Sequence, residues 1–425
     1  MRLRGNGANG KPPFDALRAC VKHDIPSGRG IALNNRQIQA GRGPHRPFIF
    51  TFVGIGAATA AAHIGNNFTT YLVGGLIEEY GFSKFAMGAW NMAETLSYAA
   101  AMFLVAPRAR SMDARLLALI ATLLVIAAQA GSALTSSYTL LLLGRIGTGL
   151  GFGLMNSAVN LAAGRTDQPA RWISLGISFQ TILYALIAIG LPKLGESYGV
   201  SGMFLALAGL GLILGGMTLF LPGGSVLVED RVASPTNKPI GREGRLILIA
   251  MALFSFGSLA IWPFIEQTAK AIGIPSTQFG IYQSMAVLAS ALGNAALAAV
   301  IARLSRAWPL AAALGACGAC CALLTTVGSD IAFAAAFVAF MVTWFLTYPL
   351  LLGLTYAHDE SGRLAVMTTG TWLLATSFGS LAAGTIAQLL KGYTLIGPIG
   401  GAICILAIAA AWPVARRLDK QVISS

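Results

Sequence analysis

One arginine lies deep within an apolar stretch of the sequence. Residues 140–160 read LLLLGRIGTGLGFGLMNSAVN, a run that is long enough to cross a bilayer. This run contains Arg145 and the amide side chains of Asn156 and Asn160. A cation in hydrocarbon costs roughly 2.5 to 3.5 kcal/mol on insertion scales, so it usually faces water or an ionised partner inside a bundle. Arg145 is therefore the first candidate for a functional charge.

A carboxylate and a histidine are predicted at a similar depth in neighbouring spans. Glu94 lies near the middle of an apolar run that begins near residue 84, and His63 lies in the run that begins near residue 48. Burial favours the neutral form of a carboxylic acid, whereas a nearby cation favours its ionised form. We predict that Glu94 is a proton-coupling acid, with Arg145 as its ion-pair partner or as the counter-ion of a solute. A static structural ion pair is the alternative.

Further polar and aromatic side chains are candidates for binding a solute. His63 either takes part in proton coupling and solute binding or is a hydrogen-bonded packing residue. Asparagines follow it within a turn, while the carboxyl-terminal half supplies aromatic rings instead of a second arginine. Such residues also join helices or form interfacial belts. The predicted solute-binding residues are Arg145, His63, Asn66, Asn67, Asn156, Trp262, Trp344 and Tyr348.

The charge of these candidates suggests the kind of solute. Arg145 opposite an aromatic wall fits a small organic anion, such as an aromatic or aliphatic carboxylate. If Glu94 neutralises Arg145, a neutral solute fits equally well. Two further carboxylates, Glu266 and Asp330, lie near the predicted outer ends of spans, where we expect them to be solvated.

The composition defines the elements that must position these groups. Of the 425 residues 56% are hydrophobic and only 11% are charged, and the mean hydropathy is +0.70, which predicts an all-α protein with many membrane spans. We predict twelve transmembrane helices, because twelve apolar runs reach the roughly 20 residues that a span requires. The runs begin near residues 48, 84, 116, 137, 171, 201, 246, 277, 309, 331, 364 and 396.

The twelve runs form two sets of six on the same plan. The second set follows the first at a nearly constant offset of about 195 residues, as expected for a parallel repeat of two six-helix bundles. The predicted segments are a basic, disordered cytoplasmic tail (1–47), the first bundle (48–221), a central cytoplasmic loop (222–245), the second bundle (246–415) and a cytoplasmic tail (416–425).

The net charge of +13 is explained by membrane topology. Most of the 29 Lys and Arg residues fall in segments that twelve spans would place on one side together with both termini. Only Lys84, Lys193, Lys270 and Lys391 fall on the other side, so the positive-inside rule predicts cytoplasmic termini. A nucleic-acid partner is not required, and the Ala-, Gly- and Arg-rich composition fits a bacterial inner membrane.

The run GRIGTGLGFG at 144–153, together with the two sets of six spans, resembles the major facilitator superfamily over residues 47–417. Arg145, Gly149 and Gly151 match the R-x-x-x-G-x-G signature of that family's fourth span. The resemblance implies a secondary transporter with a central cavity, in which the span-4 arginine handles protons or substrate. The loops 107–115 and 303–309 depart from the family pattern, so no subfamily is assigned.

We predict a proton-coupled uptake permease for a small organic solute such as an organic or aromatic acid. Efflux of amphipathic compounds is the alternative within transport, and a non-transporting membrane receptor is the alternative from another class. The sequence offers no hydrolytic or metal-binding constellation and no phosphate loop of the form G-x-x-x-x-G-K-[ST], so we expect neither an enzyme nor a cofactor or metal. The expected partners are the solute, protons and the bilayer, and we expect a monomer.

Overall fold

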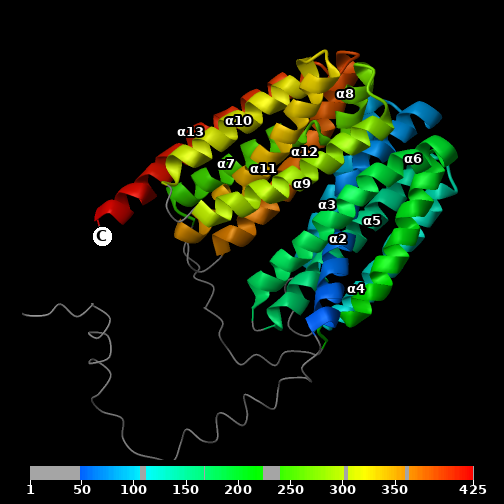
Figure 1. Cartoon of the computed structure of the whole chain (residues 1–425), viewed down its shortest axis with the longest axis horizontal. Coiled ribbons are helices and arrows are strands. Elements are labelled where there is room, and N and C mark those ends of the chain that lie inside the picture. The colour runs from blue at the N-terminus through cyan, green and yellow to red at the C-terminus, as the bar shows by residue number, and fades with distance from the viewer. Residues whose placement is uncertain are drawn as a thin grey trace, which may run out of the picture. The chain divides into compact units, whose positions relative to one another are not determined.

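The computed structural model describes residues 48–105, 112–166, 168–223, 240–300, 305–358 and 363–424. The predicted tail 1–47 and most of the predicted loop 222–245 lie outside these residues. All regular elements of the described part are helices (Figure 1). Eight helical segments are long and apolar enough to cross a membrane. The predicted all-α, multi-pass architecture is confirmed, whereas twelve crossings and cytoplasmic termini stay predictions.

The first half of the described chain ends in a long, kinked helix. Helix α6 contains two predicted spans, because the run expected to begin near residue 201 continues from the preceding helix. The kink lies at Gly199, whose φ of 67° and ψ of −169° favour glycine. The helices of this half are α2 (Phe48–Tyr80), α3 (Lys84–Val105), α4 (Ala114–Ala133), α5 (Tyr138–Gly164), α6 (Pro169–Met217) and the 3-10 helix η2 (Thr218–Phe220).

The second half begins with a broken helix. The span predicted near residue 246 begins at Arg242 and is interrupted before Pro263, which cannot donate the hydrogen bond of a continuous helix. Helix α13 continues to Ser424 and so includes most of the predicted tail 416–425. The helices are α7 (Arg242–Leu259), the 3-10 helix η3 (Trp262–Phe264), α8 (Ile265–Ala271), α9 (Ser276–Val300), α10 (Ala307–Thr326), α11 (Asp330–His358), α12 (Arg363–Leu389) and α13 (Ile396–Ser424).

The two halves meet through two equivalent pairs of helices and through contacts of α2 with η3 and α8. Helix α3 packs against α12, and α6 packs against α9. Under the predicted repeat, α9 corresponds to α3 and α12 corresponds to the first part of α6, so one contact is the counterpart of the other. Among the described residues, α3, α9 and α12 are less apolar than the eight segments that could cross a membrane, whereas α6, the fourth helix of these contacts, is one of the eight.

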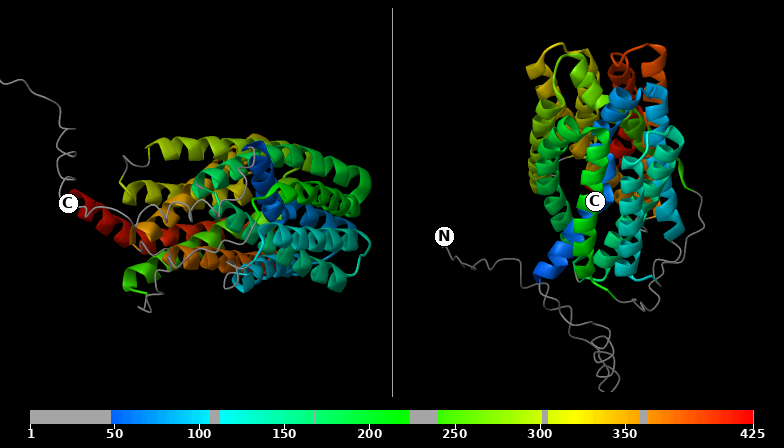
Figure 2. Two further views of the ribbon diagram at one scale, coloured as in Figure 1. Left: turned by 90° about the horizontal axis from the view of Figure 1, so that it is seen from below. Right: turned by 90° about the vertical axis from the view of Figure 1, so that its right-hand side faces the viewer.

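Hydrogen bonds join the two halves at one end of the bundle. We call the end with Phe48, Phe220, Arg242 and Ser424 the terminal end, and the end with the Gly81, Gly199 and Gly273 turns the distal end. Within the described residues, the bonds between halves involve positions 66–95 of the first half and 262–283 or 377–388 of the second, which lie between the middle of the bundle and the distal end. In Figure 1 the ribbons of the halves lie together near α8 and further apart toward the C-terminus, and in both views of Figure 2 the long helices run roughly along one direction.

The contact between α3 and α12 depends on two glycines. A Cβ added to Gly88 would lie 2.6 Å from the carbonyl oxygen of Ser380, and one added to Gly384 would lie 2.5 Å from the carbonyl oxygen of Lys84. Both distances are too short for a real contact. The absence of side chains therefore allows the two backbones to touch, as in other closely packed membrane helices.

We predict that Gly384→Val destabilises the protein by about 1–3 kcal/mol, because the added methyl groups must push α12 away from α3. The measurement is the unfolding midpoint of purified protein in detergent. Gly353→Val is the matched control, since Gly353 is exposed on α11 with no atom near its Cβ position. Equal midpoints for the two variants would show that the helices do not meet at Gly384.

Candidate functional site

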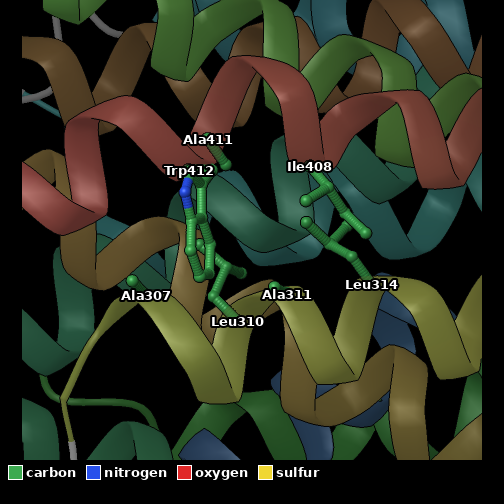
Figure 3. Close-up of a pocket in the computed structure, with 7 residues that line it drawn as sticks. All are labelled: Ala307, Leu310, Ala311, Leu314, Ile408, Ala411 and Trp412. Atoms are coloured by element: carbon green, nitrogen blue, oxygen red, sulfur yellow. The ribbon is translucent and has the colours of Figure 1, made fainter.

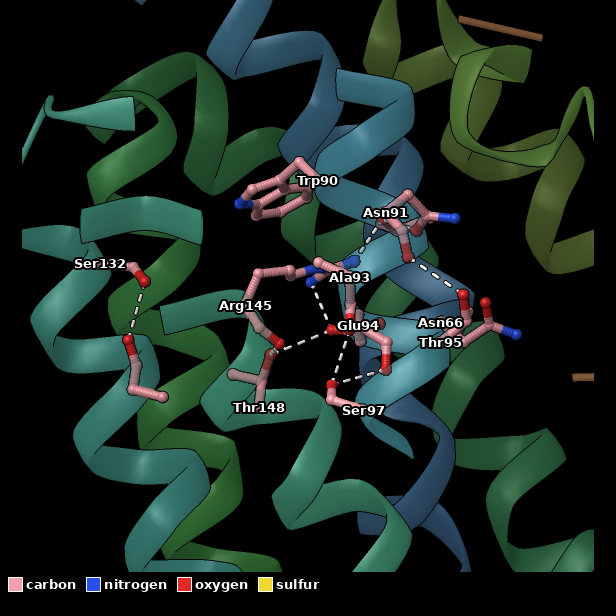
Figure 4. A network of polar contacts seen from close by, with 12 residues as sticks. Asn66, Trp90, Asn91, Ala93, Glu94, Thr95, Ser97, Ser132, Arg145 and Thr148 are labelled. Atoms are coloured by element: carbon pink, nitrogen blue, oxygen red, sulfur yellow. Dashed lines mark hydrogen bonds and ion pairs between the residues drawn. The ribbon is translucent and has the colours of Figure 1, made fainter. Parts of the chain in front are cut away.

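Glu94 and Arg145 form an ion pair inside the first half. Glu94 lies on α3 and Arg145 on α5, and the Arg145 NH1 to Glu94 Oε2 distance is 2.7 Å (Figure 4). Each side chain is only 1% exposed. Thr148, one turn after Arg145, donates its hydroxyl hydrogen to the same carboxylate oxygen at 3.1 Å. The two opposite charges therefore compensate each other in a place that water does not reach.

Three helices hold the guanidinium group. Arg145 NH2 donates to Thr69 Oγ1 of α2 at 2.5 Å, and its guanidinium carbon lies 3.9 Å from the ring centre of Trp90 on α3. Gly149 allows the close approach of α5 to α3, because a Cβ there would collide with the Glu94 carbonyl oxygen and the Ser97 hydroxyl. Arg145 is thus enclosed by its own half and is not directed toward the space between the halves.

A chain of hydrogen bonds leads from this pair to the other half. The Thr69 hydroxyl, which accepts from Arg145, donates to Asn91 Oδ1 at 2.9 Å. Asn91 Nδ2 donates to Ser380 Oγ of α12 at 2.8 Å, and the hydroxyls of Thr95 and Ser377 are 2.6 Å apart. The buried charge pair is therefore two side chains removed from the contact between α3 and α12.

The other predicted residues of the first half lie apart from the ion pair. His63 Nδ1 lies 3.3 Å from the Tyr98 hydroxyl, and Asn67 Nδ2 donates to the carbonyl oxygen of His63 at 2.9 Å. Asn156 Nδ2 approaches Met102 Sδ at 3.5 Å. These polar side chains and Asn66 are all partly exposed, in contrast to Glu94 and Arg145.

The predicted aromatic residues form two groups in the second half. Trp262, in the break between α7 and α8, donates its indole hydrogen to the carbonyl oxygen of Asn66 at 2.7 Å and so joins the halves. Trp344 donates to Ser258 Oγ at 3.1 Å, and its ring stacks on Tyr348 with centroids 5.8 Å apart. Tyr348 in turn meets the edge of Trp372, at a centroid distance of 5.6 Å. Trp344 and Tyr348 are partly exposed, whereas Trp262 is 7% exposed.

Several residues of this network were not predicted as site residues. Thr69, Trp90 and Thr148 are common residue types in apolar helices, and only the packing shows that they surround Arg145. Tyr71 was also missed, although it donates to Gln283 Oε1 across the halves at 2.6 Å. Tyr71 is only two residues from Thr69, but this spacing did not indicate a shared site, because Thr69 contacts α3 and Tyr71 contacts α9.

The expectation that Glu266 is solvated was wrong. Its side chain is 2% exposed, because the break after α7 directs the short helix α8 against α2. Asp330, by contrast, accepts hydrogen bonds from Gln278 at 2.7 Å and Tyr282 at 2.5 Å within the second half.

The described part of the chain contains an apolar groove between α10 and α13, but it does not resemble a solute site (Figure 3). Its lining consists of alanine, leucine and isoleucine side chains with the ring of Trp412 at one end. The lining residues are Ala307, Leu310, Ala311, Leu314, Ile408, Ala411 and Trp412. No group of His, Cys, Asp and Glu able to hold a metal ion occurs among the described residues.

No family model matches this sequence, and no curated protein matches it. Solved structures do match it in fold. A D-xylose–proton symporter has a TM-score of 0.68 at 12% identity, covering 86% of this chain and 96% of that chain. A bacterial homologue of the human lysosomal transporter Spinster, in an inward-facing and unoccupied conformation, has a TM-score of 0.63 at 14% identity, covering 90% and 96%. A human organic anion transporter has a TM-score of 0.60 at 15% identity, covering 86% and 100%.

These proteins are transporters of the major facilitator superfamily, and the chain shares their fold over most of its length. The resemblance first seen in residues 144–153 is therefore confirmed at the level of the fold, with no subfamily identified. The TM-scores of 0.60–0.68 establish the shared arrangement of helices, and identities of only 12–15% leave the solute open.

We predict that Arg145→Met destabilises the protein by about 3–5 kcal/mol, because it leaves the Glu94 carboxylate buried without its cation. The double variant Glu94→Gln/Arg145→Met removes both charges and should recover a large part of that loss. The unfolding free energies of the four proteins form a double-mutant cycle. Additive effects of the two substitutions would show that the charges do not interact.

Proposed function

We propose that this protein is a secondary active transporter that takes up a small organic acid together with protons by alternating access. The fold it shares with transporters supports the class. The observation that carries the proposal is the asymmetry of the hydrogen bonds between the halves, which in the described chain lie from the middle of the bundle to the distal end. Such an arrangement is expected of a protein that is closed on one side of the membrane and opens by rocking of the halves.

The Glu94–Arg145 pair is the proposed site of proton coupling. Glu94 Oε1 is buried and has no hydrogen-bond partner among the described residues, although Oε2 contacts Arg145. A proton on this carboxyl group would leave the Arg145 charge uncompensated in a dry site, which is costly. The Thr69–Asn91–Ser380 chain then offers a path by which that change reaches the contact between the halves.

An organic acid fits the change in charge at this pair. With Glu94 ionised, the pair has no net charge, and with Glu94 protonated it has one positive charge in a medium of low dielectric constant. A carboxylate solute would be attracted to that charge. Contacts with the solute would come from the partly exposed groups of both halves, namely His63, Asn66, Asn67, Asn156, Trp344 and Tyr348.

The proposed orientation places both termini in the cytoplasm of a bacterium and the distal end outside its inner membrane. In that orientation the hydrogen-bonded distal end would close the outer side, which supports an inward-facing state. A similar protein, the Spinster homologue, was solved in an inward-facing and unoccupied conformation. Transport in inverted and right-side-out vesicles tests the direction, because an exporter of amphipathic compounds would accumulate them only in inverted vesicles.

We predict that Glu94→Gln abolishes proton-driven accumulation in proteoliposomes but spares solute exchange, because exchange needs no net proton movement. The solute is first found by comparing a deletion strain with its parent for growth on single organic acids. Asp330→Asn is the matched control, since it removes a carboxylate that is bonded only within the second half in the described chain. Intact accumulation by Glu94→Gln would rule out Glu94 as the coupling acid.

A further inference from the structure

Glu266 lies directly in the contact that closes the distal end. It belongs to α8 in the second half, and its backbone nitrogen donates to Thr70 Oγ1 of α2 in the first half at 3.0 Å. Its Oε2 atom lies only 2.5 Å from the position that a Cβ at Gly74 would occupy. The carboxyl group is therefore pressed against the backbone of α2, and any separation of the halves at this end would expose it.

The two oxygens of this carboxyl group have different surroundings. Oε1 accepts from Ser276 Oγ at 2.5 Å and lies 3.4 Å from Lys270 Nζ. Oε2 is buried and has no hydrogen-bond partner within the described residues. The oxygens of a buried carboxylate usually accept hydrogen bonds, and an oxygen without a donor makes the ionised form costly. In Glu266 this oxygen is Oε2.

The nearest cation is already shared. Lys270 Nζ lies 2.7 and 2.9 Å from the two carboxylate oxygens of Glu78 on α2, closer than its 3.4 Å distance from Glu266. Gln267 also donates to Glu78, at 2.8 Å. Two carboxylates thus face one ammonium group. The more buried of the two, Glu266, is the one that lies farther from it. Glu78 is 48% exposed, whereas Glu266 is 2% exposed.

The other ionisable groups near this contact have partners of their own, and the nearby Tyr71 donates its hydroxyl hydrogen to Gln283 Oε1. Glu79 accepts from the backbone nitrogen of Val200 at 2.6 Å within the first half. Lys84 lies 4.4 Å from the ring centre of Tyr393, between α12 and α13. Burial, with a smaller effect of the Glu78 charge, raises the pKa of Tyr393 to about 12, so this phenol stays neutral near neutral pH. Glu266 is therefore the group whose charge would change.

We propose that Glu266 is a second proton-binding site, which holds a proton while the distal end is closed and releases it when that end opens to water. The inference rests on the proposed alternation between two states. A proton that binds more tightly to the closed form stabilises that form, so lower pH favours closure and higher pH favours opening. Protons arriving at the distal side would then help to close it behind a bound solute.

The test measures the conformation of the distal end without solute or gradient. Spin labels at Ser197→Cys in the first half and Ala271→Cys in the second, both exposed, report the distance across this end in lipid nanodiscs. We expect the short distances of the wild-type protein to give way to longer ones as the pH rises from mildly acidic to mildly alkaline. Glu266→Gln, which is neutral at every pH, should lose this response and keep the short distances throughout.

Asp330→Asn, a carboxylate change at the same end but away from the contact, should keep the wild-type response. Glu266→Met is a second uncharged variant of similar size, and it should also lose the response. A pH response in the uncharged variants equal to that of the wild type, or none in the wild type, would overturn the proposal. The spin-label experiment measures no flux, so it does not depend on the outcome of the transport assay with Glu94→Gln. Likewise, a negative result here would leave the proposed role of Glu94 untouched.

Discussion

A guanidinium group in an apolar bundle must find its counter-charge and its hydrogen-bond acceptors within the protein, because lipid offers neither. Arg145 meets this requirement through Glu94, Thr69 and the face of Trp90. These partners come from α2 and α3, so the charge fixes both helices against α5. The lack of a side chain at Gly149 is part of the same arrangement, since only a glycine lets the backbones come close enough for the pair to form.

The same requirement connects the charge pair to the contact between the halves. The side-chain amide of Asn91 accepts a hydrogen bond from Thr69 and donates one to Ser380. The hydrogen bonds around Arg145 and those between α3 and α12 therefore share this one amide group. At the distal end Glu266 has a comparable position, between Ser276 of its own half and Gly74 of the other. Two buried carboxyl groups, one in each half, thus lie where their charge would affect how the halves meet.

Much of the architecture was predictable from the sequence. Except for the run near residue 201, which continues α6, apolar runs gave helix starts within a few residues of those observed, and the constant offset between them predicted a repeat with which the two equivalent contacts of the halves agree. Depth along the spans also placed Glu94 and Arg145 at one level, where the structure pairs them. These features follow from helix length and residue type alone, so they can be predicted from the sequence.

Other features depend on contacts between distant segments. Glu266 lies near a span end and was expected in water, but the break before Pro263 turns α8 toward α2 and buries it. Thr69 and Trp90 belong to types that fill any membrane helix, so their role beside Arg145 could not be read from composition. The sequence left the enclosure of Arg145 within its own half open, as the alternative of a structural ion pair, because periodicity shows which residues share a face and not which neighbour covers that face.

The central claim is that Glu94 changes its protonation state at its buried position beside Arg145. Infrared difference spectroscopy of the protein in lipid, titrated from mildly alkaline to acidic pH, observes this directly. The account predicts a protonated-carboxyl band that grows as the pH falls and is missing from the same titration of Glu94→Gln. Identical difference spectra for the two proteins would show that Glu94 does not change its protonation state over this pH range, and would contradict the account.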